Sequence, residues 1–453
     1  MEVTNPATGE REETVEEHTE SEVEAAIERA TEAYEGWRDR PIREREELLA
    51  DAGDVLREHK REYAETMARE MGKPITQGIA EVEKCAWVCD HYAQYGSAYL
   101  EADSHPSPPG SAVETVYDPL GPILAVMPWN FPFWQVFRFA APHLTSGNVG
   151  LLKHASNVPG CAQAIEDVFR EAGYPEDVFQ TLLIPSDLVD DVIEDERVEA
   201  ATVTGSGPAG RAVSSAAGNQ LMKSVLELGG SDPFVVLNDA DLADAAETAA
   251  WARNQNGGQS CIAGKRFLVH ADVYDEFVDR FVDEVESLTI GDPMDEETDV
   301  GPQARTDLME ELHEQVEASV EAGARVLIGG EPMDRKGAYY PPTILTDVPE
   351  GCPADKEETF GPVAAVYEID DEDEIVAKAN DTRFGLGASV WTTDRERGRR
   401  LAREIEAGCV YVNQLVKSDP RVPFGGIKDS GHGRELAREG MLEFVNRKTV
   451  WVE

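Results

Sequence analysis

Short apolar runs alternate with helix-length segments through the middle of the chain. Four such runs lie at 123–127, 149–153, 179–183 and 200–204, and each is too short for a helix of ordinary length. Strands that are buried on both faces have nearly continuous apolar sequences, and helices connect them in α/β proteins. The pattern therefore predicts a parallel sheet that is covered by helices on both sides.

The chain before these runs has a different pattern. Residues 43–100 are predicted to be largely helical, and the proline-rich loop 103–110 follows them. Apolar and polar residues then alternate at 112–117, which predicts a strand with one exposed face. A chain of 453 residues exceeds one ordinary hydrophobic core, so we expect at least two domains.

Polar residues and glycines stand at the ends of the predicted strands. Asn130, Lys153 and Gly205 occupy such positions, and ligands of parallel sheets bind at the carboxyl ends of the strands. Gly205 is followed by Gly207 and Gly210, which is the spacing of a dinucleotide-binding loop between a strand and a helix. These observations predict a ligand site at one edge of the sheet.

Two further motifs contain a candidate base and a candidate nucleophile. Glu227 lies in the run Leu-Glu-Leu-Gly-Gly, and Cys261 ends the run Gly-Gln-Ser-Cys. A thiolate is a strong nucleophile, and a carboxylate in a dry site can act as a base near neutral pH. Taken alone, the cysteine is equally typical of a small buried residue and the glutamate of a strand end. The acidic residue that usually follows a dinucleotide loop would also fall near Glu227, so a ribose-binding role competes with that of a base.

Another motif, Pro-Trp-Asn-Phe-Pro at 128–132, places an asparagine between two prolines in an apolar setting. A buried asparagine must form hydrogen bonds. Together with the two motifs above, in this order and at similar spacing, the run resembles the aldehyde dehydrogenase superfamily. The resemblance covers nearly the whole chain, with further matches at Lys153, 204–206, 357–362 and 423–428.

The resemblance implies that an aldehyde is oxidised to a carboxylic acid with NAD or NADP, through a thioester on cysteine. Cys261 would attack the aldehyde, Asn130 and the Cys261 backbone N–H would stabilise the oxyanion, and Glu227 would activate water. Lys153 and Ser156 would hold the adenine ribose. The resemblance places these residues at the cofactor: Trp129, Lys153, Ser156, Gly205, Ser206, Gly210, Glu358 and Phe360. No metal is expected.

Ser156 bears on the choice of cofactor. Members of the superfamily that prefer NAD commonly have glutamate at this position, and its charge repels the 2′-phosphate of NADP. Serine removes that repulsion, and Lys153 beside it adds a cation. We therefore expect NADP to be accepted and preferred over NAD, although members with a small residue here often use both.

Two residues that depart from the superfamily average indicate the substrate. Arg138 matches an arginine that binds the far carboxylate of the substrate in succinate semialdehyde dehydrogenases, and a guanidinium suits a carboxylate. Ser418 matches a serine at the substrate mouth of the same subfamily, and 147–155 and 226–241 resemble its short bacterial type. We expect oxidation of succinate semialdehyde to succinate. The alternative for Arg138 is a structural salt bridge or an ordinary surface arginine.

The resemblance also implies the aldehyde dehydrogenase fold, an α/β architecture with three parts. Residues 1–104 and 120–228 would form a Rossmann-like NAD(P)-binding domain with a parallel sheet, and 229–420 an α/β catalytic domain. Residues 105–119 and 433–453 would form a small β oligomerisation element. Such elements pair subunits in the superfamily, so we expect a homodimer or a homotetramer.

Acidic residues are in large excess, since 89 Asp and Glu against 41 Lys and Arg give a formal charge of −48. This charge repels duplex nucleic acid and anionic membranes, so neither is an expected partner. The excess is dispersed and lysine is scarce relative to arginine, which resembles proteins from salt-saturated cytoplasm; an ordinary acidic mesophilic enzyme is the alternative. We recognise no signal sequence and no long apolar span, so a cytoplasmic location is expected.

The six cysteines are scattered through the chain and do not form a dense disulfide framework. Cys85 and Cys89 lie four residues apart on a predicted helix and could share a metal. No second Cys or His pair completes a ligand set, however, which favours helix packing.

Two other functions remain open for the chain. One is a related enzyme that oxidises another aldehyde or passes the acyl group to coenzyme A, although relatives of the latter kind usually lack the carboxylate of Glu227. The other is a non-enzymatic binding or structural protein of the same superfamily. The complete set of Cys261, Glu227 and Asn130 disfavours this second function.

Overall fold

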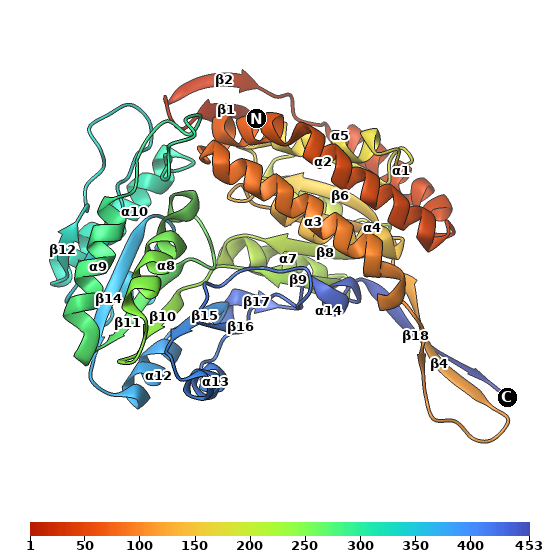
Figure 1. Cartoon of the computed structure of the whole chain (residues 1–453). Coiled ribbons are helices and arrows are strands. Elements are labelled where there is room, and N and C mark those ends of the chain that lie inside the picture. Colours follow the sequence, from red (N-terminus) through yellow and green to blue (C-terminus); the bar gives the residue numbers. More distant parts are fainter.

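The structure consists of two α/β units and a projecting β arm (Figure 1). It is a computed structural model that describes residues 1–453. One unit contains a six-stranded sheet, the other a seven-stranded sheet, and the arm a three-stranded sheet. Both main sheets are largely parallel, which confirms the predicted fold class. No helix combines the length and the apolar character that a membrane crossing requires.

The six-stranded sheet contains the four strands that the apolar runs predicted. Its strands lie in the order β17, β9, β8, β5, β6 and β7, and only β17 runs antiparallel to its neighbour. A large core of buried aliphatic and aromatic side chains joins this sheet to its helices. The strands are β5 (Pro122–Met127), β6 (Val149–His154), β7 (Phe179–Thr181), β8 (Ala200–Thr204), β9 (Lys223–Glu227) and β17 (Gly431–His432).

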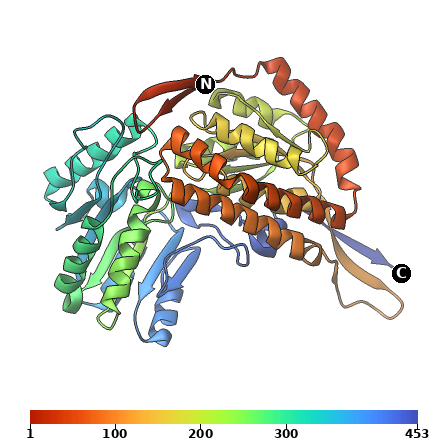
Figure 2. The same cartoon turned by 45° about the horizontal axis from the view of Figure 1, so that its top comes forward.

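The long helical segment predicted before the sheet is two helices, which lie side by side across this unit (Figure 2). Gly72 ends the first helix in the left-handed conformation, and Pro74 precedes the second. A glycine in this conformation stops a helix, and proline is favoured at a helix start. The helices of the unit are α1 (Glu20–Arg38), α2 (Ile42–Met71), α3 (Ile75–Tyr99), α4 (Trp134–Ser146), α5 (Pro159–Glu171), η1 (Ser186–Leu188), α6 (Val189–Glu194), α7 (Gly207–Asn219) and α14 (Ala437–Met441).

The seven-stranded sheet lies in the second unit, and β12 is its one antiparallel strand. Its strands in spatial order are β12 (Arg325–Ile328), β13 (Thr343–Thr346), β14 (Val363–Ile369), β11 (Gly264–His270), β10 (Asp232–Val236), β15 (Gly387–Trp391) and β16 (Cys409–Val412). Its helices are α8 (Leu242–Asn254), η2 (Gln255–Gly258), η3 (Ala271–Val273), α9 (Tyr274–Glu286), α10 (Thr306–Ala322), α11 (Pro353–Lys356), α12 (Glu372–Asn380) and α13 (Arg395–Glu404). The short helix η4 (Lys428–Ser430) precedes β17.

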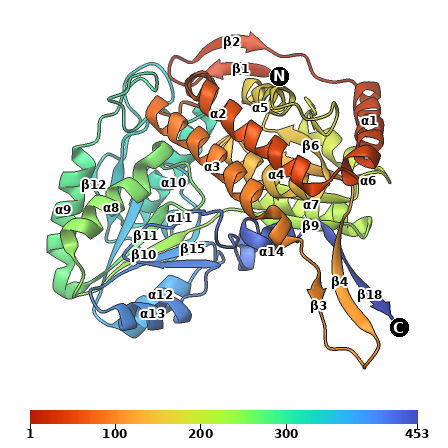
Figure 3. The ribbon, with the colours of Figure 1, turned by 45° about the vertical axis from the view of Figure 1, so that its right-hand side comes forward.

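The arm projects from the six-stranded unit and includes the C-terminal strand (Figure 3). Its strands are β3 (Asp103–Ser104), β4 (Ala112–Pro119) and β18 (Val445–Val452), with β18 at an edge. The strand expected at 112–117 is thus present. The C-terminal part of the arm begins later than the expected residue 433, because Leu436, Met441 and Phe444 are buried in the core of the six-stranded unit.

A hairpin at the N-terminus reaches across both units (Figures 1 and 2). It consists of β1 (Glu2–Asn5) and β2 (Glu10–Thr14). The Ala338 N–H of the second unit donates a hydrogen bond to the Pro6 carbonyl at 2.8 Å. The hairpin therefore ties the two units together.

Candidate active site

The carboxyl ends of the parallel strands lie on one edge of the six-stranded sheet. Thr204 at the end of β8 pairs in register with Glu227 at the end of β9, and the Gly205 N–H donates to the Glu227 carbonyl at 3.0 Å. Asn130 follows β5, the strand next to β8. The structure therefore brings the glycine loop, Asn130 and Glu227 to the same edge.

Cys261 lies on a tight turn that follows α8 and η2. Asn256, Gly257 and Gly258 have φ angles of 56°, 62° and 74°, so three consecutive residues adopt the left-handed conformation that favours glycine and asparagine. At Gly258 an added Cβ would overlap the backbone of Gly361. The glycine before Gln-Ser-Cys is therefore needed for both conformation and space.

Arg253 holds this turn from the protein interior. Its buried guanidinium donates to the carbonyl oxygens of Gly258 at 2.7 Å, of Gly264 at 3.3 Å and of Gly361. Carbonyl oxygens satisfy guanidinium donors without adding a charge. The backbone near Cys261 is thus fixed by an arginine that has no carboxylate partner.

A hydrogen-bonded amide network surrounds the catalytic asparagine candidate. Asn130 Nδ2 donates to the Gln259 carbonyl at 3.0 Å, Gln135 Nε2 donates to Asn130 Oδ1 at 3.1 Å, and Asn256 Nδ2 donates to the Asn130 carbonyl at 2.7 Å. One Nδ2 hydrogen of Asn130 remains for a ligand, and the Cys261 N–H donates no hydrogen bond within the protein. Both donors can therefore serve an oxyanion.

The two glycines after Glu227 leave room for two other parts of the site. At Gly229 an added Cβ would overlap the carboxylate of Glu358, and at Gly230 it would lie 2.6 Å from the Cys261 carbonyl oxygen. The Gly230 N–H also donates to Glu358 Oε1 at 3.0 Å. The Glu-Leu-Gly-Gly motif thus supplies the carboxylate of Glu227. Its two glycines leave room for Glu358 and for the Cys261 turn to pack against the chain.

Glu227 is almost fully buried, and neither oxygen of its carboxyl group has a hydrogen-bond partner. Burial raises its pKa well above the usual range, and the negative charge of Glu435 raises the pKa further, while Arg138 and Arg434 lower it. A buried carboxyl group with a raised pKa and no structural partner is typical of a proton-transfer group. Glu227 is therefore available to exchange a proton with a ligand or water.

Arg138 is also buried, in α4, and it forms an ion pair with Glu435. Its Nη2 donates to Thr204 Oγ1 at 3.3 Å, and the guanidinium carbon lies 4.9 Å from the centre of the Phe424 ring. The salt bridge that the sequence left open as an alternative is thus present. A role for Arg138 in binding the substrate stays a prediction.

Replacing Arg138 with leucine is expected to lower the free energy of unfolding by about 3 kcal/mol or more, because it leaves the Glu435 carboxylate buried without a partner. Urea unfolding followed by tryptophan fluorescence in high-salt buffer would measure the loss. Arg280→Leu is the matched control, since Arg280 pairs with Glu276 on an exposed helix face. An Arg138→Leu protein as stable as that control would show that the ion pair is not needed for folding.

The surroundings of Cys261 favour the protonated thiol over the thiolate. Burial raises the pKa of Cys261 to about 12, although the nearby charges of Lys265 and Arg138 lower it. Lys265 Nζ donates to the Cys261 carbonyl at 2.8 Å and to the Ser260 carbonyl at 3.0 Å. Formation of the thiolate, which is the reactive form, therefore requires removal of a proton by a base or a change at the site.

Alkylation of Cys261 by iodoacetamide is expected to accelerate about tenfold per pH unit from pH 7 to pH 9, because a thiol with a raised pKa forms thiolate in proportion to hydroxide. Peptide mapping by mass spectrometry in the absence of cofactor would give the rate. The denatured chain is the control, in which the rate levels off near the ordinary thiol pKa of about 8.5. A plateau below pH 8 in the folded protein would reveal a thiolate that is already formed.

Lys153 provides a buried cation for the cofactor. It lies in β6 beside the exposed Ser156, and its Nζ has one side-chain partner, Ser186 Oγ at 3.3 Å. No carboxylate pairs with it, and burial lowers its pKa. An uncompensated ammonium beside an uncharged serine fits a ribose that carries a phosphate better than one that does not.

The glycine loop opens α7 in the way that a dinucleotide site requires. The Ser206 side chain caps the helix by accepting from the Ala209 N–H at 3.4 Å, and a helix N-terminus favours a phosphate group. An added Cβ at Gly210 would lie 2.5 Å from the Leu228 side chain. Gly210 thus allows α7 to pack closely on the chain that continues from β9.

The other expected cofactor residues come from the second unit and from the loop after β5. Phe360 and Trp129 meet edge to face with ring centres 5.8 Å apart. Glu358 is partly exposed and lies 3.4 Å from the buried Lys265. The structure therefore places Trp129, Phe360 and Glu358 between the two units, as one cluster near the Cys261 turn.

Ser418 lies with two residues of the first unit. Its Oγ accepts hydrogen bonds from Lys84 Nζ at 2.8 Å and from Trp134 Nε1 at 2.9 Å. All three side chains belong to segments far apart in the sequence, and Lys84 comes from α3. The serine that the sequence assigned to the substrate mouth is thus bonded to a lysine.

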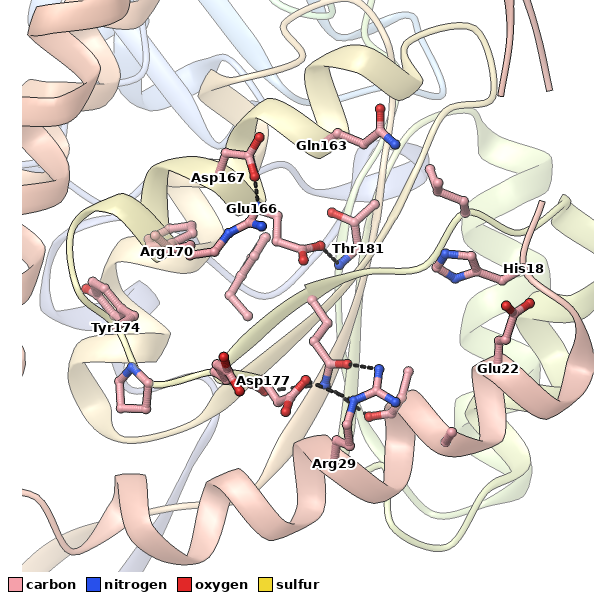
Figure 4. A pocket seen from close by; sticks show the side chains of 18 of the residues that line it. His18, Glu22, Arg29, Gln163, Glu166, Asp167, Arg170, Tyr174, Asp177 and Thr181 are labelled. Carbon is pink, nitrogen blue, oxygen red and sulfur yellow. Dashed lines mark hydrogen bonds and ion pairs between the residues drawn. The ribbon is translucent and has the colours of Figure 1, made fainter. Parts of the chain in front are cut away.

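A broad hollow on the surface lies elsewhere. Its volume is about 980 Å³, and it lies between α1, α5 and the edge strand β7 (Figure 4). Several of its polar side chains bond to one another or to the backbone, as Arg29 does with Asp177 at 3.0 Å and Glu166 with the Thr181 N–H at 2.7 Å. None of the candidate catalytic residues lines it, so we do not place the substrate there.

Four residues of the site were missed from the sequence: Lys84, Arg253, Lys265 and Glu435. Lys265 had a usable signal, because it stands four residues after the candidate nucleophile. The other three had none, since each reaches the site from a segment whose own pattern indicates only a helix or a loop. Glu435 lies within the range assigned to oligomerisation.

Comparisons with known proteins agree with this geometry. Residues 1–450 match the aldehyde dehydrogenase family. A Synechocystis sp. protein described as a probable succinate-semialdehyde dehydrogenase (NADP+) is 53% identical over 448 residues, which are 99% of this chain and 98% of that protein. The succinate-semialdehyde dehydrogenase (NADP+) 1 of Mycobacterium tuberculosis is 49% identical over 450 residues, again 99% and 98%. The crystal structure of succinic semialdehyde dehydrogenase from Streptococcus pyogenes in complex with NADP+ is 35% identical, with a TM-score of 0.97 and coverage of 100% of this chain and 99% of that one. The chain belongs to the aldehyde dehydrogenase family.

Proposed function

We propose that this protein oxidises succinate semialdehyde to succinate, with NADP as the preferred cofactor. The observation that carries the proposal is a buried Glu227 without a hydrogen-bond partner, on the strand edge that also holds Asn130 and faces the turn of Cys261. The relatives from Synechocystis and Mycobacterium tuberculosis support the choice of substrate and of cofactor.

Each residue has its own step in the proposed reaction. The Cys261 thiolate attacks the aldehyde carbon, and the oxyanion accepts hydrogen bonds from Asn130 Nδ2 and the Cys261 N–H, worth roughly 3 kcal/mol each in the transition state. When bound, the nicotinamide cofactor supplies the hydride acceptor by which the adduct becomes a thioester. Glu227 then takes a proton from water as the water attacks the thioester carbon, and the C–S bond breaks to release the acid and the thiolate.

The residues present fit an NADP-type dinucleotide. Lys153 and Ser156 would hold the adenosine ribose and its phosphate, and the capped N-terminus of α7 at Ser206 would face the pyrophosphate. Trp129 and Phe360 would flank the nicotinamide end, where Glu358 would hold the ribose. These assignments account for the absence of any carboxylate beside Lys153.

Replacing Ser156 with glutamate is expected to reverse the cofactor preference. The new carboxylate would repel the 2′-phosphate of NADP and accept bonds from the ribose hydroxyls of NAD. The ratio of kcat/KM for NADP over NAD should fall by about a hundredfold, because two effects of at least 1.4 kcal/mol each act in the same direction. Ser156→Gln, which adds size without charge, is the control, and an equal change in both variants would contradict the charge argument.

A panel of aldehydes tests the proposed function directly. Initial rates in high-potassium buffer with succinate semialdehyde, glutarate semialdehyde, butanal and betaine aldehyde, each with NAD and with NADP, would give the kcat/KM values. We expect a strong preference for succinate semialdehyde. If the kcat/KM values are similar for all four aldehydes, or higher for the uncharged ones, the dehydrogenase chemistry stands. The assignment of succinate semialdehyde as the substrate would then be wrong.

We also propose that the six-stranded unit binds the cofactor, that the seven-stranded unit completes the catalytic site, and that the arm joins subunits into a cytoplasmic homodimer or homotetramer. The edge strand β18 supports the last point, because its unpaired side can add to a sheet of another copy. Trp451 on this strand is 56% exposed, as expected of an apolar residue that a partner covers.

A further inference from the structure

A lysine without a carboxylate partner contacts Ser418, the residue that the resemblance places at the substrate mouth. Lys84 Nζ donates to Ser418 Oγ at 2.8 Å and lies 4.0 Å from the centre of the Trp134 ring. Trp134 Nε1 donates to the same hydroxyl oxygen at 2.9 Å. A hydroxyl and the face of a ring hold the ammonium in place, but neither neutralises its charge.

The other charged groups around Lys84 are already paired. These pairs are Lys73 with Glu81, Arg421 with Asp419, and Arg138 with Glu435. Burial and, to a smaller extent, the charge of Arg138 lower the pKa of Lys84 to about 8, so the side chain is still mainly charged at pH 7. A half-buried ammonium with no counter-charge is costly unless an anion binds to it.

Lys84 also lines a cavity that includes chain neighbours of the candidate catalytic residues. The cavity has a volume of about 310 Å³ and lies between α3, the start of α4 and the turn η2. Its lining includes the apolar rings Phe131, Trp134 and Trp251, together with Gln255. Phe131 directly follows the oxyanion-binding candidate Asn130, and Gln255 begins the turn that leads to Cys261. A cation and apolar walls thus meet in a cavity whose lining residues Phe131 and Gln255 are close in the chain to Asn130 and to the Cys261 turn.

We propose that Lys84 binds the far carboxylate of the substrate, and that Ser418 and Trp134 position its ammonium group. The inference rests on the proposed function, in which the substrate is an aldehyde with a carboxylate at its other end. The apolar rings of the cavity suit the methylene carbons between the two groups. Arg138, which the resemblance assigned to this carboxylate, already balances Glu435, whereas the charge of Lys84 is free.

The test compares Lys84→Met with the unmodified enzyme at pH 7 and saturating NADP. Methionine keeps the apolar contact with Trp134 and removes the charge. We expect kcat/KM for succinate semialdehyde to fall at least tenfold, mainly through KM, and kcat/KM for butanal to stay within twofold. Lys84→Arg, which retains a cation, should recover most of the loss. Lys60→Met is the matched control, because Lys60 of α2 pairs with Glu83, which directly precedes Lys84 in α3. This substitution should leave kcat/KM unchanged for both aldehydes.

A second measurement does not depend on turnover of the semialdehyde. Succinate has the same far carboxylate, so we expect it to inhibit butanal oxidation competitively in the unmodified enzyme and at least tenfold more weakly in Lys84→Met. Lys84→Gln is a second neutral variant, which can still bond to Ser418. It guards against a folding defect in Lys84→Met. It must likewise lower kcat/KM for succinate semialdehyde far more than kcat/KM for butanal.

Two failures can be told apart. The unmodified enzyme could prefer succinate semialdehyde while kcat/KM of the neutral variants falls equally for both aldehydes, or for neither. In that case the assignment of Lys84 is wrong, and the carboxylate binds to another cation such as Arg138. If the unmodified enzyme itself shows no preference for the carboxylated aldehyde, the proposed function fails, and the role of Lys84 fails with it.

Discussion

Replacing Cys261 with alanine is expected to abolish aldehyde oxidation, with kcat reduced by about four orders of magnitude or more. Alanine cannot form the covalent adduct, and no other thiol lies on the turn that Arg253 and the amide network hold in place. The effect is large because every later step, including thioester hydrolysis, requires the sulfur. Binding of NADP should persist, since none of the cofactor residues contacts the Cys261 side chain through a hydrogen bond.

Stopped-flow absorbance at 340 nm would detect any first turnover in Cys261→Ala, and isothermal titration calorimetry would confirm that NADP still binds. Cys409→Ala is the control, because Cys409 is another partly buried thiol but lies on β16 of the seven-stranded sheet. Residual turnover of the Cys261 variant above about 1% of the normal rate would contradict the covalent mechanism.

Much of the site can be predicted from sequence because each key residue is tied to its local backbone. Glu227 ends a strand and is followed by two glycines that the approach of Glu358 and the Cys261 turn requires. Cys261 follows three left-handed residues. Such requirements leave a signature within a few residues, which is why short motifs located the base and the nucleophile.

The partners of the site residues were not predictable in the same way. The contact between Lys84 and Ser418 joins positions 334 residues apart, and the ion pair of Arg138 joins a helix of the first unit to the loop after β17. Nothing in the pattern of an amphipathic helix shows that one of its lysines faces a cavity. Long-range pairs of this kind depend on how distant segments of the chain pack together, and that packing has no local signature.

The helix break at 72–74 is a contrasting case, because its signal was present in the sequence. Gly-Lys-Pro combines a residue that stops a helix with one that starts the next. The prediction of a largely helical segment over 43–100 did not include this boundary. A glycine closely followed by a proline marks a helix boundary even inside a segment that is otherwise helical.

Replacing Glu227 with glutamine is expected to preserve the first burst of reduced cofactor and to slow steady turnover by about a thousandfold. Glutamine keeps the shape of the side chain but cannot accept a proton from water, so the thioester forms and then persists. General base catalysis contributes roughly 10² to 10⁴ in rate, and water does not readily attack the thioester without it. Stopped-flow kinetics with succinate semialdehyde and NADP would separate the burst from the steady rate. Asn130→Ala is the contrasting variant, because loss of an oxyanion donor should slow the burst itself.

The pH dependence of the steady rate then distinguishes a base from a structural carboxylate. Burial and the charge of Glu435 raise the pKa of Glu227, so this carboxyl group stays protonated to a higher pH than an exposed one and accepts a proton only above its pKa. The steady rate of the unmodified enzyme should therefore rise as the pH passes through the raised pKa of Glu227, whereas Glu227→Gln should lose that rise. If Glu227→Gln loses the burst together with the turnover, Glu227 acts before the thioester forms, as the base that removes the proton of Cys261. The raised pKa of that thiol makes this the specific alternative that the burst amplitude decides.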